Sequence, residues 1–310
     1  MGKIAFVFPG QGAQYVGMAR DIAEQSVTCR EIIYAADERL GYKLSEVMFH
    51  GPKEALTLTE NAQPALVTAS VVCSQLLKEA GVEPDMVAGH SLGEYAALAA
   101  AGALSNIDAI WLTRQRGLYM TSAVPAGQGG MAAVLGASQA QVEELCAYAA
   151  QFGVLEIANY NCPGQIVISG EMAALEAAVA QAKAYGAKKA MPLAVSGPFH
   201  CSLLSEASER LAEALEQVMF EAPQKMVIAN YSASPVCTPQ EIKQALIKQV
   251  SHPVRWEESI RLMVNNGVET IIEVGAGKVL TGLTKRIAPE VQLFNVENME
   301  SFAATVAALS

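Results

Sequence analysis

Short apolar strands alternate with amphipathic helices over both ends of this 310-residue chain. Apolar runs of about five residues are each followed by a longer stretch in which apolar positions recur every three or four residues. This alternation is typical of a parallel, doubly wound sheet that is buried on both faces. The pattern predicts strands at 3–8, 86–88, 225–229, 270–274 and 291–296, with helices before residue 40 and at 63–80, 92–101, 107–120, 202–218, 239–250, 256–266 and 278–287.

The middle of the chain has a different order of elements. It lies between the Gly- and Pro-rich stretch at 122–130 and Gly197-Pro198, and such stretches mark boundaries. The order βαββαβ within it is typical of a ferredoxin-like unit. The sequence therefore predicts an α/β fold, in which residues 1–126 and 197–310 form a large domain and residues 127–196 a small inserted subdomain. The small unit's predicted strands are 131–135, 154–160, 165–169 and 187–193, and its helices 139–151 and 172–185.

Composition narrows the class of partner. The net charge is −10, which argues against nucleic acid or an anionic membrane as the main partner, because both are bound by clustered Lys and Arg. No apolar run reaches the length of a membrane span, and the first residues lack the apolar core of a signal peptide, so we expect a cytoplasmic protein. The six cysteines show no C-x-x-C or Cys/His ligand spacing, and we expect no metal site.

Ser91 lies in a G-x-S-x-G pentapeptide, Gly89 to Gly93, between a predicted strand and a predicted helix. This context is typical of a nucleophile elbow, a sharp turn that raises a serine hydroxyl above a sheet. The glycines suit such a turn because a side chain there would collide with the neighbouring backbone. Backbone N–H groups at the start of the helix, that of Leu92 first, would face a developing oxyanion. We expect acyl transfer at Ser91; the alternative is a tight structural turn.

A second oxyanion donor is expected from Gln11, in the loop Pro9-Gly10-Gln11-Gly12 after the first strand, because an elbow needs an N–H group from another loop. The alternative is a plain strand-to-helix turn. A dinucleotide loop is excluded, because Tyr15 stands where the third glycine would be.

His200 is the expected base, because it follows a loop just where the chain re-enters the large domain. The alternative is a histidine that caps the following helix. Asp108 is the last aspartate in the chain, so the imidazole would be oriented by a glutamate or by a neutral acceptor, with Gln249 as one candidate.

Arg114 and Arg116 lie two residues apart on a predicted helix and so on different faces. An arginine directed into the cleft would bind a substrate carboxylate through two parallel hydrogen bonds. The alternative is a solvated helix face, and the sequence does not choose between them.

These motifs together resemble the malonyl-CoA:acyl carrier protein transacylase family over nearly the whole chain. The resemblance implies a hydrolase-like parallel-sheet core with the ferredoxin-like insert. It rests on Phe8-Pro9-Gly10-Gln11-Gly12, Asn61-Ala62-Gln63-Pro64-Ala65, Gly89-His90-Ser91-Leu92-Gly93-Glu94-Tyr95, Arg116-Gly117, Asn159-Tyr160-Asn161-Cys162-Pro163-Gly164-Gln165, Gly197-Pro198-Phe199-His200 and Pro253-Val254-Arg255-Trp256.

The resemblance also implies roles for individual residues. Ser91 would be the nucleophile, His200 its base, Gln249 the residue that orients the histidine, and Gln11 with Leu92 the oxyanion hole. Arg116 would hold the malonyl carboxylate. Other substrate-binding positions would be Gln63 and Met120 in the acyl pocket, Asn159 and Gln165 in their shared motif, and Phe199, which is similar to the malonyl-selective type although Gly197-Pro198 does not match that pattern.

The implied reaction is ping-pong transfer of a malonyl group from malonyl-CoA to the phosphopantetheine thiol of an acyl carrier protein in fatty acid biosynthesis, without a metal or redox cofactor. An acidic carrier would need a local basic patch, for which Lys188-Lys189 and Lys285-Arg286 are candidates. Three alternatives stay open: a trans-acting malonyl acyltransferase of a polyketide pathway, a serine esterase or thioesterase, and an inactive docking domain.

Overall fold

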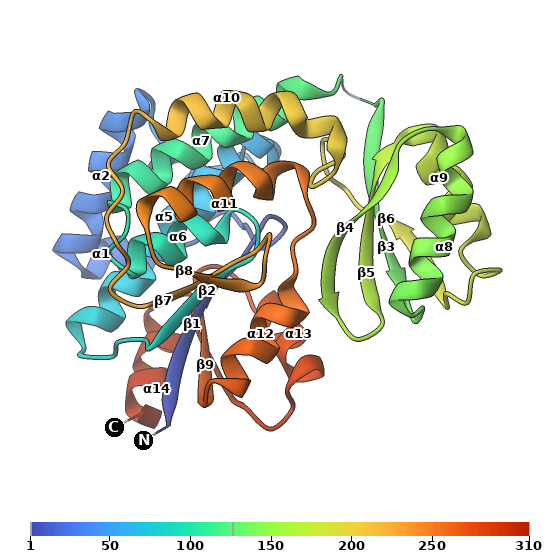
Figure 1. Ribbon diagram of the computed structural model, residues 1–310. Coiled ribbons are helices and arrows are strands. Elements are labelled where there is room, and N and C mark those ends of the chain that lie inside the picture. The colour runs from blue at the N-terminus through green and yellow to red at the C-terminus, as the bar shows by residue number, and fades with distance from the viewer. Residues whose placement is uncertain (1, 126, 310) are drawn as a thin grey trace.

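The protein contains two sheets, each with its own helices, and the smaller unit lies beside one end of the larger (Figure 1). The computed structural model describes residues 2–125 and 127–309. The larger sheet has the strand order β10-β9-β1-β2-β7-β8. Its strands are β1 (Lys3–Phe8), β2 (Met86–Gly89), β7 (Met226–Ala229), β8 (Ser234–Val236), β9 (Val268–Val274) and β10 (Gln292–Val296).

Every neighbouring pair in this sheet is parallel except β7 and β8. In the register of β1 with β2, Phe8 lies opposite Gly89. Because both strands end at the same edge of the sheet, the loop that carries Gln11 and the turn that carries Ser91 emerge side by side. This edge is where open α/β sheets bind their ligands.

Helices cover both faces of the large sheet. Phe6 and Phe8 of β1 pack into an apolar cluster with α5, α6 and α7, whereas Ala5 and Val7 face a second cluster with α12 and α13. Burial on both faces explains the unbroken apolar strands of the sequence. The helices of this unit are α1 (Arg20–Gln25), α2 (Val27–Leu40), α3 (Leu44–His50), α4 (Lys53–Thr57), α5 (Thr59–Glu79), α6 (Gly93–Ala100), α7 (Asn106–Ala123), η2 (Ser202–Leu204), α10 (Ser205–Leu215), α11 (Pro239–Ser251), α12 (Trp256–Asn265), α13 (Val279–Ile287) and α14 (Met299–Leu309).

The smaller sheet is antiparallel, with the order β4-β5-β3-β6, and it has an apolar cluster of its own. The predicted α/β fold, a parallel core with an antiparallel ferredoxin-like insert, is confirmed. Domain boundaries at 126/127 and 196/197 stay a prediction, and residue 126 lies outside the described residues. The elements are β3 (Gly129–Leu135), α8 (Gln139–Ala149), η1 (Ala150–Phe152), β4 (Leu155–Cys162), β5 (Gln165–Glu171), α9 (Met172–Gln181) and β6 (Lys189–Pro192).

Helix α5 begins four residues before the predicted position 63, with Pro64 inside it, so that prediction was wrong at the N-terminus. A proline lacks an N–H group and leaves the carbonyl four residues earlier without its helical partner. Here that carbonyl, of Glu60, accepts a hydrogen bond from Arg114 Nη1 (2.6 Å). The sequence pattern also did not predict α3, α4, β8 or α14, of which the first three are too short for a clear period.

The turn between β2 and α6 holds Ser91 in a left-handed conformation, with φ of 53°. The chain passes so close to itself that a Cβ atom on Gly89 would lie 1.9 Å from the backbone of Gly93. A Cβ atom on Gly93 would in turn lie 2.3 Å from the carbonyl oxygen of Phe8. Both glycines of the pentapeptide are therefore required by sterics.

We predict that Gly89→Ala lowers the free energy of unfolding by about 3 kcal/mol or more, because backbone atoms on both sides would have to move. Gly282→Ala is the control: this glycine is exposed in α13 and an added Cβ meets nothing within 4 Å. It should stabilise the protein by about 0.5–1 kcal/mol through helix propensity. Urea denaturation measures both, and a Gly89→Ala protein as stable as the parent would contradict the steric requirement.

Candidate active site

Ser91, His200 and Gln249 form a chain of hydrogen bonds at the carboxyl edge of the large sheet. His200 Nδ1 lies 2.7 Å from the backbone carbonyl oxygen of Gln249, which only accepts, so Nδ1 carries the proton. Nε2 is then the acceptor for the hydroxyl of Ser91, at 2.8 Å. A neutral carbonyl thus holds the imidazole in the tautomer that a general base requires.

His200 is buried, with 3% of its surface exposed. Burial lowers the pKa of the imidazole to about 3, and the positive charge of Arg116 is the second cause. The protonated form is disfavoured in both cases because a cation would lose its hydration and be repelled. His200 is therefore neutral at physiological pH and able to accept a proton.

Arg116 is the cation of the site and is only 1% exposed. Nη2 donates to Ser91 Oγ (3.0 Å) and to Gln249 Oε1 (2.9 Å), and Nη1 donates to Gln63 Oε1 (2.7 Å). Gln63 Nε2 contacts Met120 Sδ (3.6 Å) on the same helix as Arg116. The sequence left open whether Arg114 or Arg116 points into the cleft. In the structure Arg116 faces Ser91, whereas Arg114 stacks on Tyr42.

The side chain of Gln249 joins three parts of the site. Its Nε2 donates to the carbonyl oxygen of Ser91 (2.8 Å) and to Glu94 Oε2 (2.8 Å), while Oε1 accepts from Arg116. Glu94 is buried, and burial raises the pKa of its carboxyl group to about 7, against the opposing effect of the Gln249 hydrogen bond. Glu94 was not predicted as a site residue, although a single carboxylate in the alanine-rich run 93–100 was an available signal.

Asn230, after β7, stabilises the turn and was also missed. Its Oδ1 accepts from the N–H of Ser91 (2.7 Å), and its Nδ2 donates to the carbonyl of Gly89 (2.6 Å). Its own N–H donates to Glu94 Oε2 (3.1 Å). No sequence motif marked this residue, because the contact depends on β2 and β7 being neighbours.

The expected oxyanion donors lie at the ends of β1 and β2. Leu92 is buried at the start of α6, and Gln11 lies in the loop after β1. Within the described residues, neither backbone N–H has a hydrogen-bond acceptor. The side chain of Gln11 donates through Nε2 to Thr59 Oγ1 (3.1 Å).

The remaining predicted positions are less closely tied to Ser91. Phe199 is buried beside His200, and Asn159 is buried in β4, where it pairs with Val254. Gln165, at the start of β5, accepts a hydrogen bond from Arg286 Nη1 (2.8 Å). Among the described residues, no hydrogen bond joins these three side chains to the side chains of Ser91, His200, Gln249 or Arg116. Asn161, from the same motif as Asn159 and Gln165, binds His90 Nε2 (2.9 Å).

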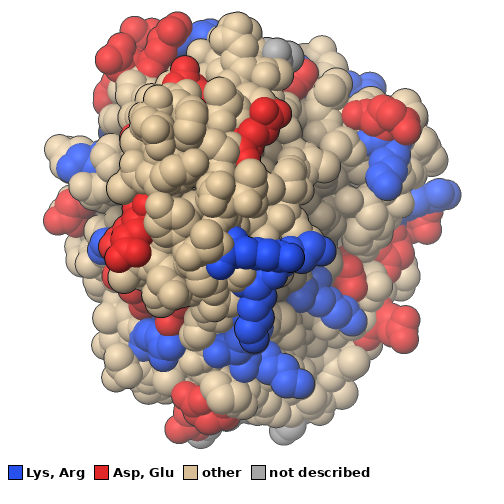
Figure 2. All heavy atoms as spheres, turned by 90° about the vertical axis from the view of Figure 1, so that its right-hand side faces the viewer, with Lys and Arg blue, Asp and Glu red and all other residues tan. Residues whose placement is uncertain are grey.

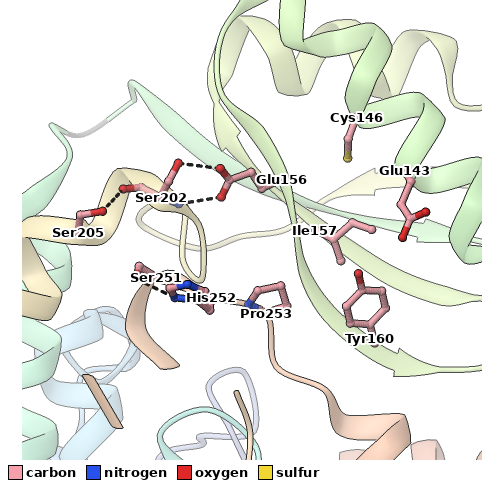
Figure 3. Close-up of a pocket in the computed structure, with 10 residues that line it drawn as sticks. All are labelled: Glu143, Cys146, Glu156, Ile157, Tyr160, Ser202, Ser205, Ser251, His252 and Pro253. Atoms are coloured by element: carbon pink, nitrogen blue, oxygen red, sulfur yellow. Dashed lines mark hydrogen bonds between the residues drawn. The ribbon is translucent and has the colours of Figure 1, made fainter. Parts of the chain in front are cut away.

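A cavity of about 480 Å³ separates the small sheet from the segment that follows His200 (Figure 3). Glu156 of β4 points across it and accepts hydrogen bonds from Ser202 N (2.8 Å) and Ser202 Oγ (2.7 Å). These bonds tie the small unit to the residues just after the histidine. The cavity does not contain Ser91; its lining is Glu143, Cys146, Glu156, Ile157, Tyr160, Ser202, Ser205, Ser251, His252 and Pro253.

In residues 2–125 and 127–309, no group of three or more His, Cys, Asp or Glu side chains could hold a metal ion. No helix in the same ranges is both long and apolar enough to cross a membrane.

The fold and the site define an acyltransferase. The family described as acyl transferase domain matches residues 5–303 of the chain. Malonyl CoA-acyl carrier protein transacylase from Bacillus subtilis (strain 168) is 46% identical over 310 residues, which cover 100% of this chain and 98% of that protein. The protein of that description from Escherichia coli (strain K12) is 43% identical over 307 residues, 99% of each chain.

Solved structures agree with these relatives. An acyl carrier protein S-malonyltransferase from Vibrio cholerae O1 biovar eltor has a TM-score of 0.95 at 45% identity, covering 98% of this chain and 99% of its own. A malonyl-transacylase in complex with a type II PKS acyl-carrier protein has a TM-score of 0.95 at 40% identity, covering 99% of each chain. The chain belongs to the malonyl CoA-acyl carrier protein transacylase family.

The neutrality of His200 predicts how the reactivity of Ser91 depends on pH. The rate at which a fluorophosphonate probe labels Ser91 should not fall as pH decreases from 8 to 5, because the imidazole pKa of about 3 lies below this range. A histidine with the ordinary pKa of 6.5 would be about thirty-fold less available at pH 5. Ser91→Ala controls for labelling elsewhere. A thirty-fold decrease with a midpoint near 6.5 would show that the imidazole titrates normally.

Proposed function

We propose that this protein transfers a malonyl group from malonyl-CoA to the phosphopantetheine thiol of an acyl carrier protein in fatty acid biosynthesis. The transfer passes through a malonyl ester on Ser91. The observation that carries the proposal is Arg116: a buried guanidinium that contacts the Ser91 hydroxyl and has only neutral hydrogen-bond partners. Such a cation attracts an acyl group that carries its own carboxylate.

Acylation begins with the proton of Ser91, which moves to His200 Nε2 as the serine oxygen attacks the thioester carbonyl. The oxyanion that forms is stabilised by the N–H groups of Gln11 and Leu92. When the tetrahedral intermediate collapses, the C–S bond breaks and the imidazolium returns its proton to the sulfur of CoA. The carbonyl of Gln249 keeps Nδ1–H in place throughout.

A malonyl carboxylate on Arg116 also helps the base. The positive charge of Arg116 is one cause of the low pKa of His200, and a bound carboxylate would neutralise it. The imidazolium then forms at lower cost. An acetyl group brings no carboxylate, so His200 stays a weaker base and acetyl transfer is disfavoured.

In the second half-reaction the phosphopantetheine thiol of the carrier attacks the serine ester, with His200 as its base, and Ser91 is regenerated. Acyl exchange of this kind changes no oxidation state, so malonyl-CoA is a substrate and the proposed mechanism uses no cofactor. The cytoplasmic location expected from the sequence stays a prediction.

We propose a basic cluster, formed by Lys188, Lys189, Lys285 and Arg286, as the docking surface for the carrier. Arg286 Nη2 donates to the carbonyl of Pro163 (2.7 Å), in the hairpin between β4 and β5. The same hairpin binds the backbone of Gly136, against which the side chain of Lys188 lies. All four side chains are exposed. Lys and Arg gather on this side of the molecule, with acidic side chains mostly around the edge (Figure 2). An acidic carrier would be attracted there.

The alternatives differ in what they require. A polyketide-pathway acyltransferase would use the same chemistry with a different carrier, and carrier preference separates the two. A serine esterase that acts on simple esters does not require a buried arginine beside its serine, because its substrate has no carboxylate to bind. An inactive docking domain does not require the hydrogen bond between Ser91 and His200.

We predict that malonyl-CoA adds one malonyl group to Ser91 and that acyl carrier protein removes it, both followed by intact-protein mass spectrometry. Ser91→Ala should not be labelled. Reversing charge in the basic cluster, as in Arg286→Glu, should slow only the removal step, whereas Lys225→Glu, directly before β7 and outside the cluster, should slow neither. Full labelling of Ser91→Ala would exclude Ser91 as the nucleophile, and equal removal rates would exclude the cluster as the docking surface.

Arg116→Ala should lower kcat/KM for malonyl-CoA by roughly 10²- to 4 × 10³-fold, because leaving a buried carboxylate unpaired costs about 3–5 kcal/mol and about 1.4 kcal/mol corresponds to a factor of ten. Acetyl-CoA transfer should be unchanged or improved. Arg116→Lys should recover part of the malonyl activity, since a point charge replaces a two-pronged donor.

Arg114→Ala is the matched control for Arg116→Ala. Arg114 lies on the same helix but binds the carbonyl of Glu60, so its loss should reduce stability and leave the malonyl-to-acetyl ratio unchanged. Equal losses of malonyl and acetyl transfer in Arg116→Ala would show instead that Arg116 supports the fold or binds CoA.

A further inference from the structure

Arg116 is a buried cation without a carboxylate in direct contact. Its three hydrogen bonds go to the side-chain oxygens of Gln63, Gln249 and Ser91, all neutral. Its Nε–H has no partner, and no salt bridge among the described residues includes it. A buried charge costs free energy unless an opposite charge compensates it. The free enzyme therefore needs a counter-charge nearby.

Glu94 supplies this counter-charge from the other side of Gln249. The carboxamide of Gln249 accepts from Arg116 Nη2 (2.9 Å) and donates to Glu94 Oε2 (2.8 Å), so one amide bridges the cation and the anion. Glu94 is 1% exposed. Its only other hydrogen-bond donor in the described part of the chain is the N–H of Asn230 (3.1 Å).

The charged and titratable groups around Glu94 are few. Arg116 faces it from α7, and Tyr95 follows it on α6. His200 is connected to it only through Ser91 and Gln249. Gln249 of α11 and Asn230 after β7 are neutral. Arg116 is therefore the one permanent charge in this surrounding set, and the state of Glu94 depends on whether that charge is already paired.

We propose that Glu94 is the resident counter-charge of Arg116 and determines the site's response to a dicarboxylic acyl group by taking up a proton when the substrate carboxylate pairs with Arg116. The inference rests on the proposed function, because it assumes that such a carboxylate reaches Arg116. The balance is simple: one carboxylate enters, one proton from solvent binds Glu94, and both leave with the product. The site thus never holds two anions against one cation.

The protonation of Glu94 supports this exchange. Burial raises its pKa to about 7, and the charge of Arg116 opposes the rise. When the substrate carboxylate neutralises Arg116, that opposition is lost and the pKa rises further. At about pH 7.5, Glu94 is then ionised to a larger extent in the free enzyme than in the malonyl-enzyme.

Proton uptake during acylation tests the proposal directly. Malonyl-CoA is mixed with enzyme in weak buffer at about pH 7.5 with a pH indicator, and mass spectrometry gives the extent of acylation. We expect wild type to take up about half a proton per malonyl group beyond the amount in Glu94→Gln. Released CoA contributes equally to all proteins. The control, Glu273→Gln, removes a different buried carboxylate, one that binds the N-terminus of α13, and should behave like wild type.

A second measurement does not depend on the folding of the variant. For wild type, KM for malonyl-CoA should rise by up to tenfold per pH unit above pH 7, because binding requires a proton. KM for acetyl-CoA should not. Equal proton uptake in Glu94→Gln and wild type at full acylation, or a malonyl KM independent of pH, overturns the proposal. Wild type that malonyl-CoA does not acylate at all refutes the proposed function instead.

Discussion

The arrangement of the site depends on the burial of the Arg116 guanidinium, because the residues around it must compensate a charge that is removed from water. A guanidinium at 1% exposure is stable only because its neighbours offer oxygen acceptors and a compensating carboxylate at one remove. Gln63 and Gln249 come from different helices, and neither could move without leaving a buried donor unpaired. Burial is the larger cause of the low pKa of His200, and the charge of Arg116 adds to it, so the arginine that is suited to bind an acyl carboxylate also favours the neutral form of the base.

The second constraint is steric. Ser91 adopts a positive φ in a turn where Gly89 and Gly93 touch neighbouring backbone. Strain of this kind persists only where surrounding contacts enforce it, and here Asn230 binds both sides of the turn. The hydroxyl is thereby directed at His200.

The small sheet contributes to the site mainly through the segment that follows β6 and through the hydrogen bonds of Glu156. The chain returns from β6 to the large domain through the segment that carries Phe199 and His200, and Glu156 of β4 binds Ser202 just beyond it. The position of the histidine is thus coupled to that of the insert. The hairpin between β4 and β5 also brings Lys188 near Arg286, almost one hundred residues apart in sequence, onto one face of the molecule.

Much of the fold and part of the candidate site could be predicted from the sequence. The order of the predicted elements indicated two sheets of different kinds, because strands that alternate with helices are typical of a parallel sheet and the order βαββαβ is typical of a ferredoxin-like unit. The pentapeptide at Ser91 carried its own geometric requirement, since only glycine fits where backbones touch. Other features came from contacts between segments that are distant along the chain. Which of two arginines is buried, which oxygen of Gln249 accepts from His200, and why α5 tolerates Pro64 all depended on packing between helices. Glu94 is the clearest case: a carboxylate in an apolar helix was visible in the sequence, but its partners lie 136 and 155 residues away, and only the tertiary structure could place it one carboxamide away from the buried charge of Arg116.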